Sequence, residues 1–485
     1  MDSEKLRRRQ SFKVIISEFI MVMTVIIMVI ILAFVVSGYW LNSDFKVERQ
    51  GMLQVSSIPT GASLSIDGES SWMQRTNTSK ILSSGEHTVV VSKDGYDSWT
   101  KTVNISEGLL YRLQYPRLFL QNRTAETVLD TKEFNLATIS PARDKMLLIS
   151  NTTEWQVVSL KDDKLTPKKI DISRVFSGVS LAESATTGLF LDEILTADWD
   201  SDGNHILFKV NHEDSLEWIL LDIENVKNSV NLSREFAAIF SAVEILDNSA
   251  ANLIAIQDGN LRKINVSSRA ISSVLVSNVQ SFDHFEDEVV FSALSTASST
   301  AQNSTTDTTE NSDEILVKPY TIGVLNLNNK EITNLTTTAS PAKVGISKFY
   351  NEKYITVLVD TALELYKKSN FESVKEFALS FAPQYVKVGN DGEFIEFYSG
   401  AQFATFDFES LSIREWSLEN ENFGWLDNNM LYVVENGELI VYDFDGLNRR
   451  VLAKNVSSQF PVTIVNDKWL YYFSDGALIR EKIVE

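Results

Sequence analysis

The sequence predicts an all-β protein that follows a single apolar helix, and three observations carry this prediction. Residues 19–40 form an uncharged and almost wholly apolar run. Residues 51–115 alternate apolar and polar side chains in short stretches separated by glycine turns, as half-buried strands do. From about residue 120 to the end, a strand–turn–strand unit recurs roughly every 35–45 residues. We therefore expect a helix, a small β-sandwich and a ring of repeated sheets.

The apolar run has the length of a transmembrane helix, which we place at residues 19–41. A spanning helix needs about 20 apolar residues, and it satisfies its own backbone hydrogen bonds inside the hydrocarbon. The preceding stub, residues 1–18, contains five basic residues, namely Lys5, Arg7, Arg8, Arg9 and Lys13. The charges after the run are mixed. The positive-inside rule then predicts a single-pass protein of the cell membrane, with a cytoplasmic N-terminus and extracellular C-terminal domains.

A cleaved signal peptide is the alternative, because Val35 and Ser37 are small residues that suit a cleavage site. The apolar run is longer than the roughly 7–15 residues of a signal-peptide core, and Tyr39 and Trp40 suit a membrane interface. We therefore expect an uncleaved anchor, with the lipid bilayer as its partner through residues 19–41.

The composition excludes several classes of function. The formal net charge is −21, which argues against nucleic acid as a partner because nucleic-acid binding depends on a basic surface. The chain has no cysteine, so thiol catalysis, thiolate metal sites and disulfides are excluded. An animal ectodomain of this size would normally use disulfides, so we expect a bacterial cell envelope.

The segment after the apolar run has the pattern of a small all-β module. Residues 51–68 alternate apolar and polar side chains about a Pro-Thr-Gly turn, and they end at Asp67-Gly68, a strong tight-turn signal. Further strands are expected within residues 85–96 and 99–105. His87 lies alone in one of these strands without a second ligand, so we expect a structural role for it.

At these residues the chain resembles the PEGA domain family of surface proteins. The matching segments are residues 57–62 (SIPTGA), 66–68 (IDG), 85–89 (GEHTV) and 95–96 (GY). Thr60 stands where the name-giving tetrapeptide of the family has glutamate. The resemblance implies a β-sandwich over residues 51–115 that contacts the cell envelope and has no enzymatic role.

The repeated units over residues 118–485 predict a β-propeller of seven or eight blades, because each blade is a small sheet of several short strands. Residues 197–208 form the sharpest unit, with the turn sequence WDSDG at 199–203. This unit resembles a blade of the TolB-type β-propellers, in which the turn contains a proline that is missing here. The last unit shows only three strands, so we expect residues near 118–128 to donate the fourth.

Residues 295–314 interrupt the repeats with a polar, low-complexity stretch. Such a stretch cannot bury enough apolar surface to become ordered, so we expect a disordered outward loop.

No catalytic motif is present, and we expect no catalytic residue, no cofactor-binding residue and no cofactor. The weak candidates for a metal site are Asp198, Asp200 and Asp202, which alternate before a glycine as in a calcium loop. The twelfth position of that loop would need glutamate but is Lys209, so a blade turn with solvated carboxylates is the better interpretation. The histidines of this region give no metal-site pattern: His205, His212 and His284.

Two functions fit these features. The first is a membrane-anchored extracellular binding or scaffolding protein of a bacterial cell envelope, whose propeller contacts cell-wall polysaccharide or a surface protein. The alternative is an extracellular hydrolase that acts on envelope glycans or peptides at the propeller face. A close acidic pair with a raised pKa in a propeller cleft would favour the hydrolase, and a face without such a pair would favour binding.

Overall fold

The computed structural model describes residues 3–36, 39–41, 47–150, 154–173, 175, 194–212, 215–246, 250–295, 320–389, 392–418, 420 and 423–485. Only the backbone is described for residues 3–16, 34–36, 39–41, 47–49, 70–73, 212 and 215. The chain forms two compact units, one of residues 1–122 with 484–485 and one of residues 123–483.

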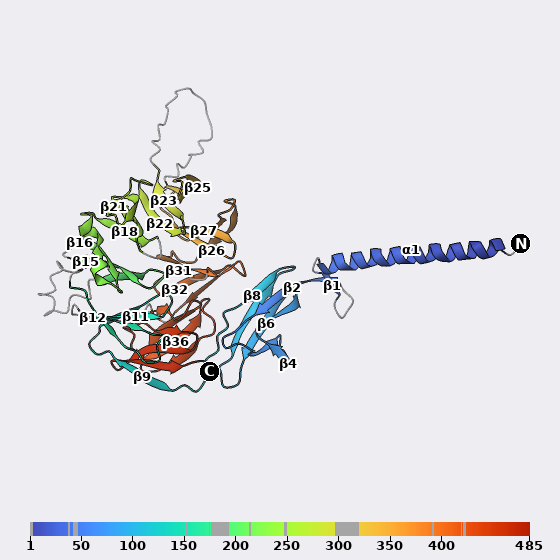
Figure 1. The fold of residues 1–485 in the computed structure, drawn as a ribbon, viewed down its shortest axis with the longest axis horizontal. Coiled ribbons are helices and arrows are strands. Elements are labelled where there is room, and N and C mark those ends of the chain that lie inside the picture. The colour runs from blue at the N-terminus through green and yellow to red at the C-terminus, as the bar shows by residue number, and fades with distance from the viewer. Residues whose placement is uncertain are drawn as a thin grey trace, which may run out of the picture. The chain divides into compact units, whose positions relative to one another are not determined.

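The first unit begins with α1 (Ser3–Val36), a helix of 34 residues (Figure 1). From Phe19 to Leu32 its side chains are exposed large apolar groups, with Thr24 as the single polar residue. Within the described part of the chain, no helix has both the length and the apolarity needed to cross a membrane. The span predicted at residues 19–41 includes residues whose side chains lie outside that part.

Two four-stranded sheets complete the first unit as a β-sandwich. One sheet contains β1 (Tyr39–Leu41), β2 (Val47–Val55), β5 (Thr78–Ser83) and β8 (Leu110–Leu113), with β8 parallel to β2. The other has the order β4 (Glu69–Arg75), β3 (Ser63–Ile66), β6 (Gly85–Ser92) and β7 (Trp99–Ile105). Buried and exposed residues alternate along the whole of β7, as the sequence pattern predicts. The fully buried Trp99 fills the core between the sheets.

The sandwich unit extends beyond residues 51–115 at both ends. Leu118, which the sequence assigned to the propeller, is fully buried in the sandwich core, and its N–H donates to the carbonyl of Ile58 at 2.8 Å. At the C-terminus, Val484 packs against the same core, and the N–H of Glu485 donates to the hydroxyl of Tyr96 at 3.1 Å. Both boundaries are set by tertiary packing of residues far apart in the sequence.

The second unit consists of eight four-stranded antiparallel sheets in its described residues, the higher of the two predicted blade numbers. Seven sheets each use four consecutive strands. The first sheet contains β10 (Leu136–Ile139), β11 (Lys145–Ile149), β12 (Glu154–Ser159) and β13 (Lys168–Asp171). The second contains β14 (Ile194–Trp199), β15 (His205–His212), β16 (Ser215–Asp222) and β17 (Val230–Asn231). The third contains β18 (Phe240–Ile245), β19 (Asn252–Gln257), β20 (Asn260–Asn265) and β21 (Ala270–Ile271). The short helices η2 (Val226–Asn228) and α3 (Leu232–Glu235) flank β17.

Sheets four to seven continue this pattern. They contain β22 (Val279–Phe285), β23 (Glu288–Leu294), β24 (Tyr320–Asn326) and β25 (Ile332–Thr338); β26 (Lys343–Phe349), β27 (Glu352–Val359), β28 (Ala362–Lys367) and β29 (Ser373–Ala378); β30 (Tyr385–Val388), β31 (Phe394–Ser399), β32 (Gln402–Asp407) and β33 (Ser412–Ser417); and β34 (Phe423–Trp425), β35 (Met430–Glu435), β36 (Glu438–Asp443) and β37 (Arg450–Ala453).

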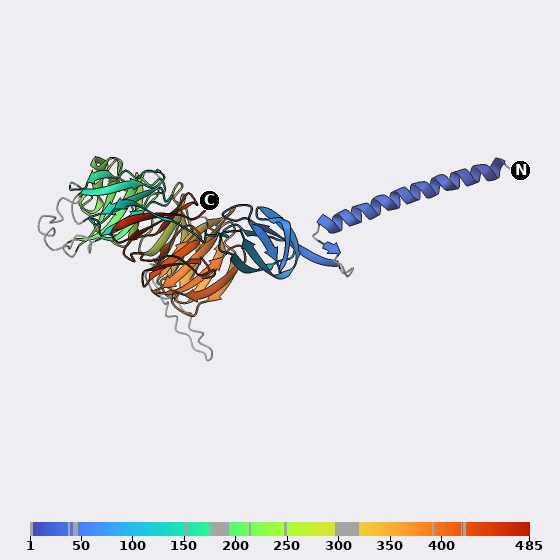
Figure 2. The ribbon, with the colours of Figure 1, turned by 90° about the horizontal axis from the view of Figure 1, so that it is seen from below.

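The eighth sheet closes the ring with a strand from the start of the unit. Its strands β38 (Thr463–Val465), β39 (Trp469–Ser474) and β40 (Ala477–Lys482) are completed by β9 (Ala125–Asp130), which pairs antiparallel with β40. In Figures 1 and 2 the teal β9 lies beside the red C-terminal strands. An ion pair of 2.8 Å between Arg480 and Glu126 joins the two strands. The predicted strand donation from residues near 118–128 is therefore confirmed.

Apolar side chains between neighbouring sheets hold the ring together. Trp155 of the first sheet contacts Phe208 of the second edge to face, with ring centroids 5.7 Å apart. Phe394 of the sixth sheet stacks on Phe444, which directly follows β36 of the seventh sheet, with ring centroids 4.5 Å apart. Because each sheet is buried on both faces in this way, its inner strands are apolar over most of their length.

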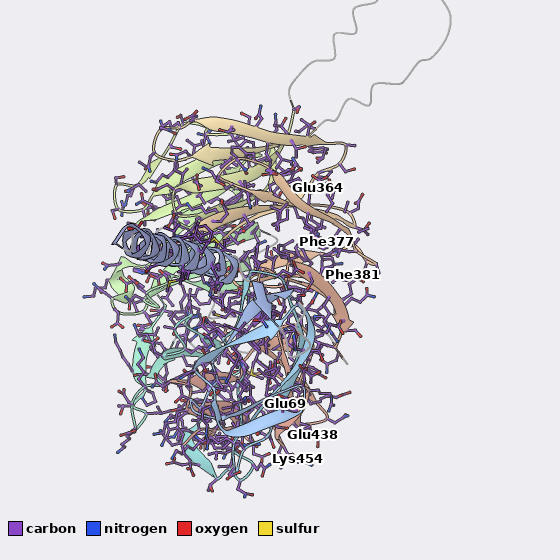
Figure 3. All side chains as sticks on the ribbon, turned by 90° about the vertical axis from the view of Figure 1, so that its right-hand side faces the viewer. Glu69, Glu364, Phe377, Phe381, Glu438 and Lys454 are labelled. Carbon is purple, nitrogen blue, oxygen red and sulfur yellow. The ribbon has the colours of Figure 1, made fainter. Side chains whose placement is uncertain are left out.

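Exposed ion pairs lie on the surface of the second unit. Glu438 and Lys454, labelled in Figure 3, form an ion pair of 3.1 Å. The loop predicted at residues 295–314 lies outside the described residues except for Ser295, whose hydroxyl bonds to that of Thr321 at 2.6 Å.

Candidate functional site: a carboxylate–histidine cavity

The first strands of four successive sheets, β18, β22, β26 and β30, line a cavity of about 860 Å³. Strand β22 packs against β26, and β26 packs against β30. In a propeller the blades surround a central channel, so contact between the first strands of neighbouring sheets places them at that channel. The cavity therefore lies where propellers commonly hold ligands.

Three side chains from two of these strands form the chemical centre of the cavity. Glu244 lies on β18, and Asp283 and His284 lie on β22. His284 Nδ1 and Glu244 Oε2 are 2.8 Å apart, within hydrogen-bond distance. One ligand atom from each of the three residues can be chosen so that all lie within 4.8 Å of one another. Among the described residues, this is the one group of three or more such side chains with that geometry.

The backbone fixes the carboxylate of Asp283 through both of its oxygens. Oδ2 accepts a hydrogen bond from the N–H of Ile346 on β26 at 2.8 Å, and Oδ1 accepts one from the N–H of His284 at 2.9 Å. A Cβ at Gly345 would lie 2.6 Å from Thr356 Oγ1 and 3.6 Å from Asp283 Oδ2. The close contact that excludes a side chain at Gly345 is thus with Thr356 on the neighbouring strand β27, while Asp283 would lie at ordinary van der Waals distance.

Burial and mutual repulsion shift the pKa values of the centre. Burial raises the pKa of Asp283 to about 7, and the charge of Glu244 adds to this effect. For His284, burial disfavours the charged form, but the hydrogen bond and the charge of Glu244 outweigh it and raise the pKa. The centre thus binds more protons near neutral pH than isolated side chains would.

A second group of charges surrounds Lys387 of β30, which also lines the cavity. Burial lowers the pKa of Lys387 to about 8, while the carboxylates of Glu396 and Asp198 oppose this shift. Glu396 is fully buried opposite Lys387 in the sheet register, and neither of its carboxylate oxygens has a hydrogen-bond partner among the described atoms. Burial raises the pKa of Asp198, and the charge of Glu244 raises it further. Asp198 thus links the two groups electrostatically.

The three aspartates of the calcium-like sequence have different roles. Asp200 is buried in the β14–β15 turn, where Oδ1 accepts the N–H groups of Asn204 and His205 at 2.8 and 2.9 Å. Asp200 Oδ2 lies 2.7 Å from His205 Nδ1, so the pair stabilises the turn. Asp202 is exposed at the turn. The described structure does not bring Asp198, Asp200 and Asp202 together as one set of metal ligands.

Sequence reasoning missed Glu244, Asp283 and Lys387, and it noted His284 without a partner. The available signal was weak: an adjacent Asp-His pair lies within the repeated units, whose strands are usually apolar. Glu244 is 40 residues distant from His284 in the chain. No local spacing could have joined them.

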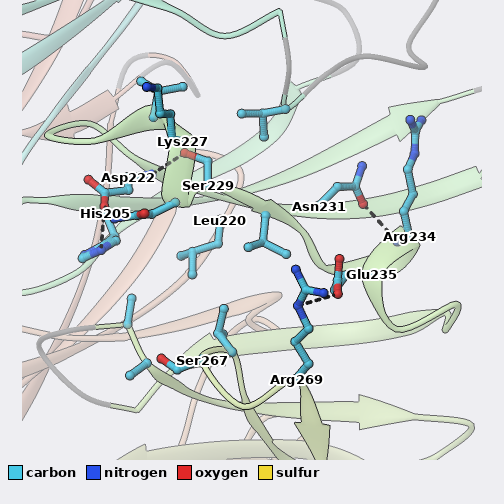
Figure 4. Close-up of a pocket in the computed structure, with 17 residues that line it drawn as sticks. His205, Leu220, Asp222, Lys227, Ser229, Asn231, Arg234, Glu235, Ser267 and Arg269 are labelled. Carbon is cyan, nitrogen blue, oxygen red and sulfur yellow. Dashed lines mark hydrogen bonds and ion pairs between the residues drawn. The ribbon is translucent and has the colours of Figure 1, made fainter.

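A second cavity, of about 790 Å³, lies beside β16, β17, α3 and the turns of the third sheet (Figure 4). Arg269 and Glu235 form an ion pair of 2.9 Å across it, and Asp222 Oδ1 accepts the N–H groups of the following turn. Arg234 pairs with Glu217 at 3.0 Å. Both arginines of this cavity are therefore held in ion pairs.

Comparison with known proteins gives one family match, to the first module, and several weak structural likenesses. The PEGA domain family matches residues 50–117. No curated protein matches the chain. The solved structures that resemble the chain include β-propellers of different activities.

Three of these structures illustrate the range. Oligogalacturonate lyase from Vibrio parahaemolyticus is 12% identical, with a TM-score of 0.38, and the match covers 60% of this chain and 89% of the lyase. PorZ, a surface component of the type-IX secretion system of Porphyromonas gingivalis, is 11% identical with a TM-score of 0.40. This match covers 72% of this chain and 42% of the PorZ chain. The β-propeller domain of Swd1 from Myceliophteria thermophila is 10% identical with a TM-score of 0.39. This match covers 75% of this chain and 100% of the Swd1 domain. At such low similarity, the activities of these proteins do not transfer to this chain.

Proposed function

We propose that this protein is a membrane-anchored extracellular binding or scaffolding protein of a bacterial cell envelope. The observation that carries the proposal is the polar cavity between the first strands of the third to sixth sheets, which is lined by Glu244, Asp283, His284 and Lys387. Concave sites with a few convergent polar groups are the usual binding sites of proteins. The propeller is the recognition part, and its partner is cell-wall polysaccharide or an envelope protein.

Two features of the first unit support the location. The exposed apolar side chains of α1 between Phe19 and Leu32 form a surface that water solvates poorly. A lipid bilayer would bury that surface, with residues 19–41 as the single span and the basic stub in the cytoplasm. The match of residues 50–117 to the PEGA domain family, which resembles surface proteins, supports the same location.

A hydrolase is the second candidate, because the cavity contains the acidic pair that would favour it. Glu244 and Asp283 have carboxylate oxygens within 4.8 Å, close to the roughly 5 Å separation of retaining glycosidases. Burial raises the pKa of Asp283 to about 7, as a general acid requires. However, the two backbone N–H groups bonded to Asp283 favour its charged form, which a general acid does not use, and Glu244 is hydrogen-bonded to His284. Binding therefore remains the first proposal.

Retention on isolated cell walls distinguishes the two candidates. The detergent-solubilised full chain is mixed with cell-wall preparations, and both bound protein and released sugar or peptide are measured. Binding without release is the expected result, and it should weaken in Lys387→Met, which removes the cavity's ammonium group. Lys454→Met, at an exposed ion pair, is the matched control. Catalytic release of sugar or peptide would replace the binding proposal with the hydrolase.

Protease treatment of intact cells tests the location separately. We expect externally added protease to digest the sandwich and propeller while the protein stays in the membrane fraction. A full-length protein that is found in the cytosol, or that is digested only after lysis, would contradict the proposal.

A further inference from the structure

We propose that Glu244, Asp283 and His284 bind a divalent transition-metal ion, such as Mn²⁺ or Zn²⁺, in the propeller cavity. The ligand atoms come from the adjacent first strands β18 and β22 and lie within 4.8 Å of one another. Metal–ligand bonds of about 2.0–2.2 Å place the ligand atoms of one ion at most roughly 4.4 Å apart. The three ligand atoms are thus close enough for small side-chain adjustments to bring them onto one ion.

The orientation of the carboxylate fits this role. Both oxygens of Asp283 accept backbone hydrogen bonds, at 2.8 and 2.9 Å, which hold the group rigidly. A carboxylate oxygen has two lone pairs, so each keeps one for a metal. Metal-binding carboxylates are commonly oriented by hydrogen bonds of this kind.

The pair of Glu244 and His284 fits as well. Nδ1 of His284 and Oε2 of Glu244 lie 2.8 Å apart, the distance of a hydrogen bond in which the two groups share one proton. A metal ion that binds these groups replaces protons, because metal ligands must be deprotonated. Binding of M²⁺ then releases the shared proton to solvent, and the charge of the ion neutralises the two carboxylates.

An independent observation points to a missing ligand in the same cavity. Ser347 lines the cavity and is only 2% exposed, and its hydroxyl has no hydrogen-bond partner among the described residues. A buried hydroxyl without a partner costs stability, typically on the scale of a lost hydrogen bond. A water molecule bound to the metal would supply a partner, because the open coordination positions of such sites are filled by water.

The chemistry of the ligands selects the kind of ion. Carboxylates bind hard cations such as Ca²⁺ and Mg²⁺, but those ions prefer sites made of oxygen alone. An imidazole nitrogen beside two carboxylates favours Mn²⁺ or Zn²⁺ instead. We therefore expect Mn²⁺ and Zn²⁺ to bind more tightly than Ca²⁺ and Mg²⁺.

Metal titration of the purified full chain tests this site and does not depend on the proposed function. The EDTA-treated protein is titrated with Mn²⁺, and the loss of the free-ion EPR signal is measured. Thermal unfolding is then compared with Zn²⁺, Mn²⁺, Ca²⁺ and Mg²⁺. We expect one Mn²⁺ per chain and a higher Tm with Mn²⁺ and Zn²⁺ than with the other two ions.

Single variants assign the binding to these residues. Glu244→Gln and Asp283→Asn should each weaken Mn²⁺ binding by at least about tenfold. Asp287→Asn, at an exposed turn residue that follows the same strand, should leave the affinity unchanged. If Asp283→Asn does not fold, the Glu244→Gln variant decides. Absence of saturable Mn²⁺ binding, or equal binding by the control and Glu244→Gln, would overturn the proposal.

Discussion

The two units each contain a histidine bonded to a carboxylate, and the difference between these pairs separates a structural contact from a candidate site. In the sandwich, His87 Nδ1 lies 2.6 Å from Asp67 Oδ2, and Nε2 lies 2.9 Å from the carbonyl of Ser83. One acid faces one base, and both ring nitrogens have partners. In the propeller, His284 meets Glu244 while a second carboxylate, Asp283, lies beside them.

Solvent makes this difference larger. The side chain of Asp67 is 48% exposed, and its hydrogen bonds with His87 and the N–H of Thr88 lower its pKa. Asp283 has similar hydrogen bonds, but burial and the charge of Glu244 raise its pKa to about 7. The same functional groups thus stabilise a turn in water, whereas in the cavity burial and a second carboxylate shift the pKa of the acid. A buried centre with shifted pKa values is typical of binding or catalytic sites.

The largest effect is expected where the backbone supports the cavity. Gly345→Ala introduces a Cβ 2.6 Å from Thr356 Oγ1, and overpacking of this kind costs about 1–3 kcal/mol. Gly68→Ala, in the turn after Asp67, meets no atom within 4 Å, so only its positive φ opposes the change, at about 1 kcal/mol. Denaturant unfolding of the two variants measures the contrast. Equal losses of stability would show that the cavity is no more tightly packed than the turn.

An intermediate effect on stability is expected for Glu288, a carboxylate in the same sheet as Asp283 that is paired with two lysines. Glu288 is 8% exposed and forms ion pairs with Lys353, at 2.9 Å, and Lys368. Burial disfavours its charge, but the two lysines outweigh this and lower its pKa. Glu288→Gln should therefore destabilise the propeller by on the order of 2 kcal/mol at pH 7.

The pH dependence of that effect has a definite sign. Because the folded pKa of Glu288 lies below its ordinary value of 4.5, its stabilisation is complete above that pH and is lost as the pH falls through the folded pKa. Thermal unfolding of the variant and the parent should converge in acid. The exposed pair of Glu438 and Lys454 provides a control, since Lys454→Ala should change stability by less than about 1 kcal/mol. A deficit of Glu288→Gln that persists unchanged in acid would contradict this account.

The smallest effect is expected at the exposed pair of the sandwich. Asp67→Asn keeps an oxygen for the N–H of Thr88 and tolerates the positive φ of 53°, but it removes the charge beside His87. The lowered pKa of Asp67 means that its contribution is present above about pH 4 and disappears as the pH falls. Thermal unfolding of the sandwich should therefore show a slightly lower Tm at pH 7 and no difference at pH 2. A large loss at pH 7 would remove the contrast with the cavity.

Much of the fold follows from local sequence patterns. The alternation within residues 51–68 and 85–105 predicted the strands of the sandwich, because the period of two decides which side chains enter the core. The repeats predicted four-stranded units, and the missing strand of the last unit led to β9 as its partner. The boundaries were less predictable, because Leu118 and Val484 join the sandwich through contacts with residues remote in sequence.

The sequence by itself determined the order of parts: an apolar helix, a module of the PEGA pattern, and repeated sheets that close on themselves. These features are local, and each depends on the period and composition of short stretches. The tertiary structure alone decided that Glu244, Asp283 and His284 meet, while the three aspartates of the calcium-like turn separate. The physical reason is that a ring of sheets places the first strand of every unit beside the next, so side chains 40 residues apart share one cavity.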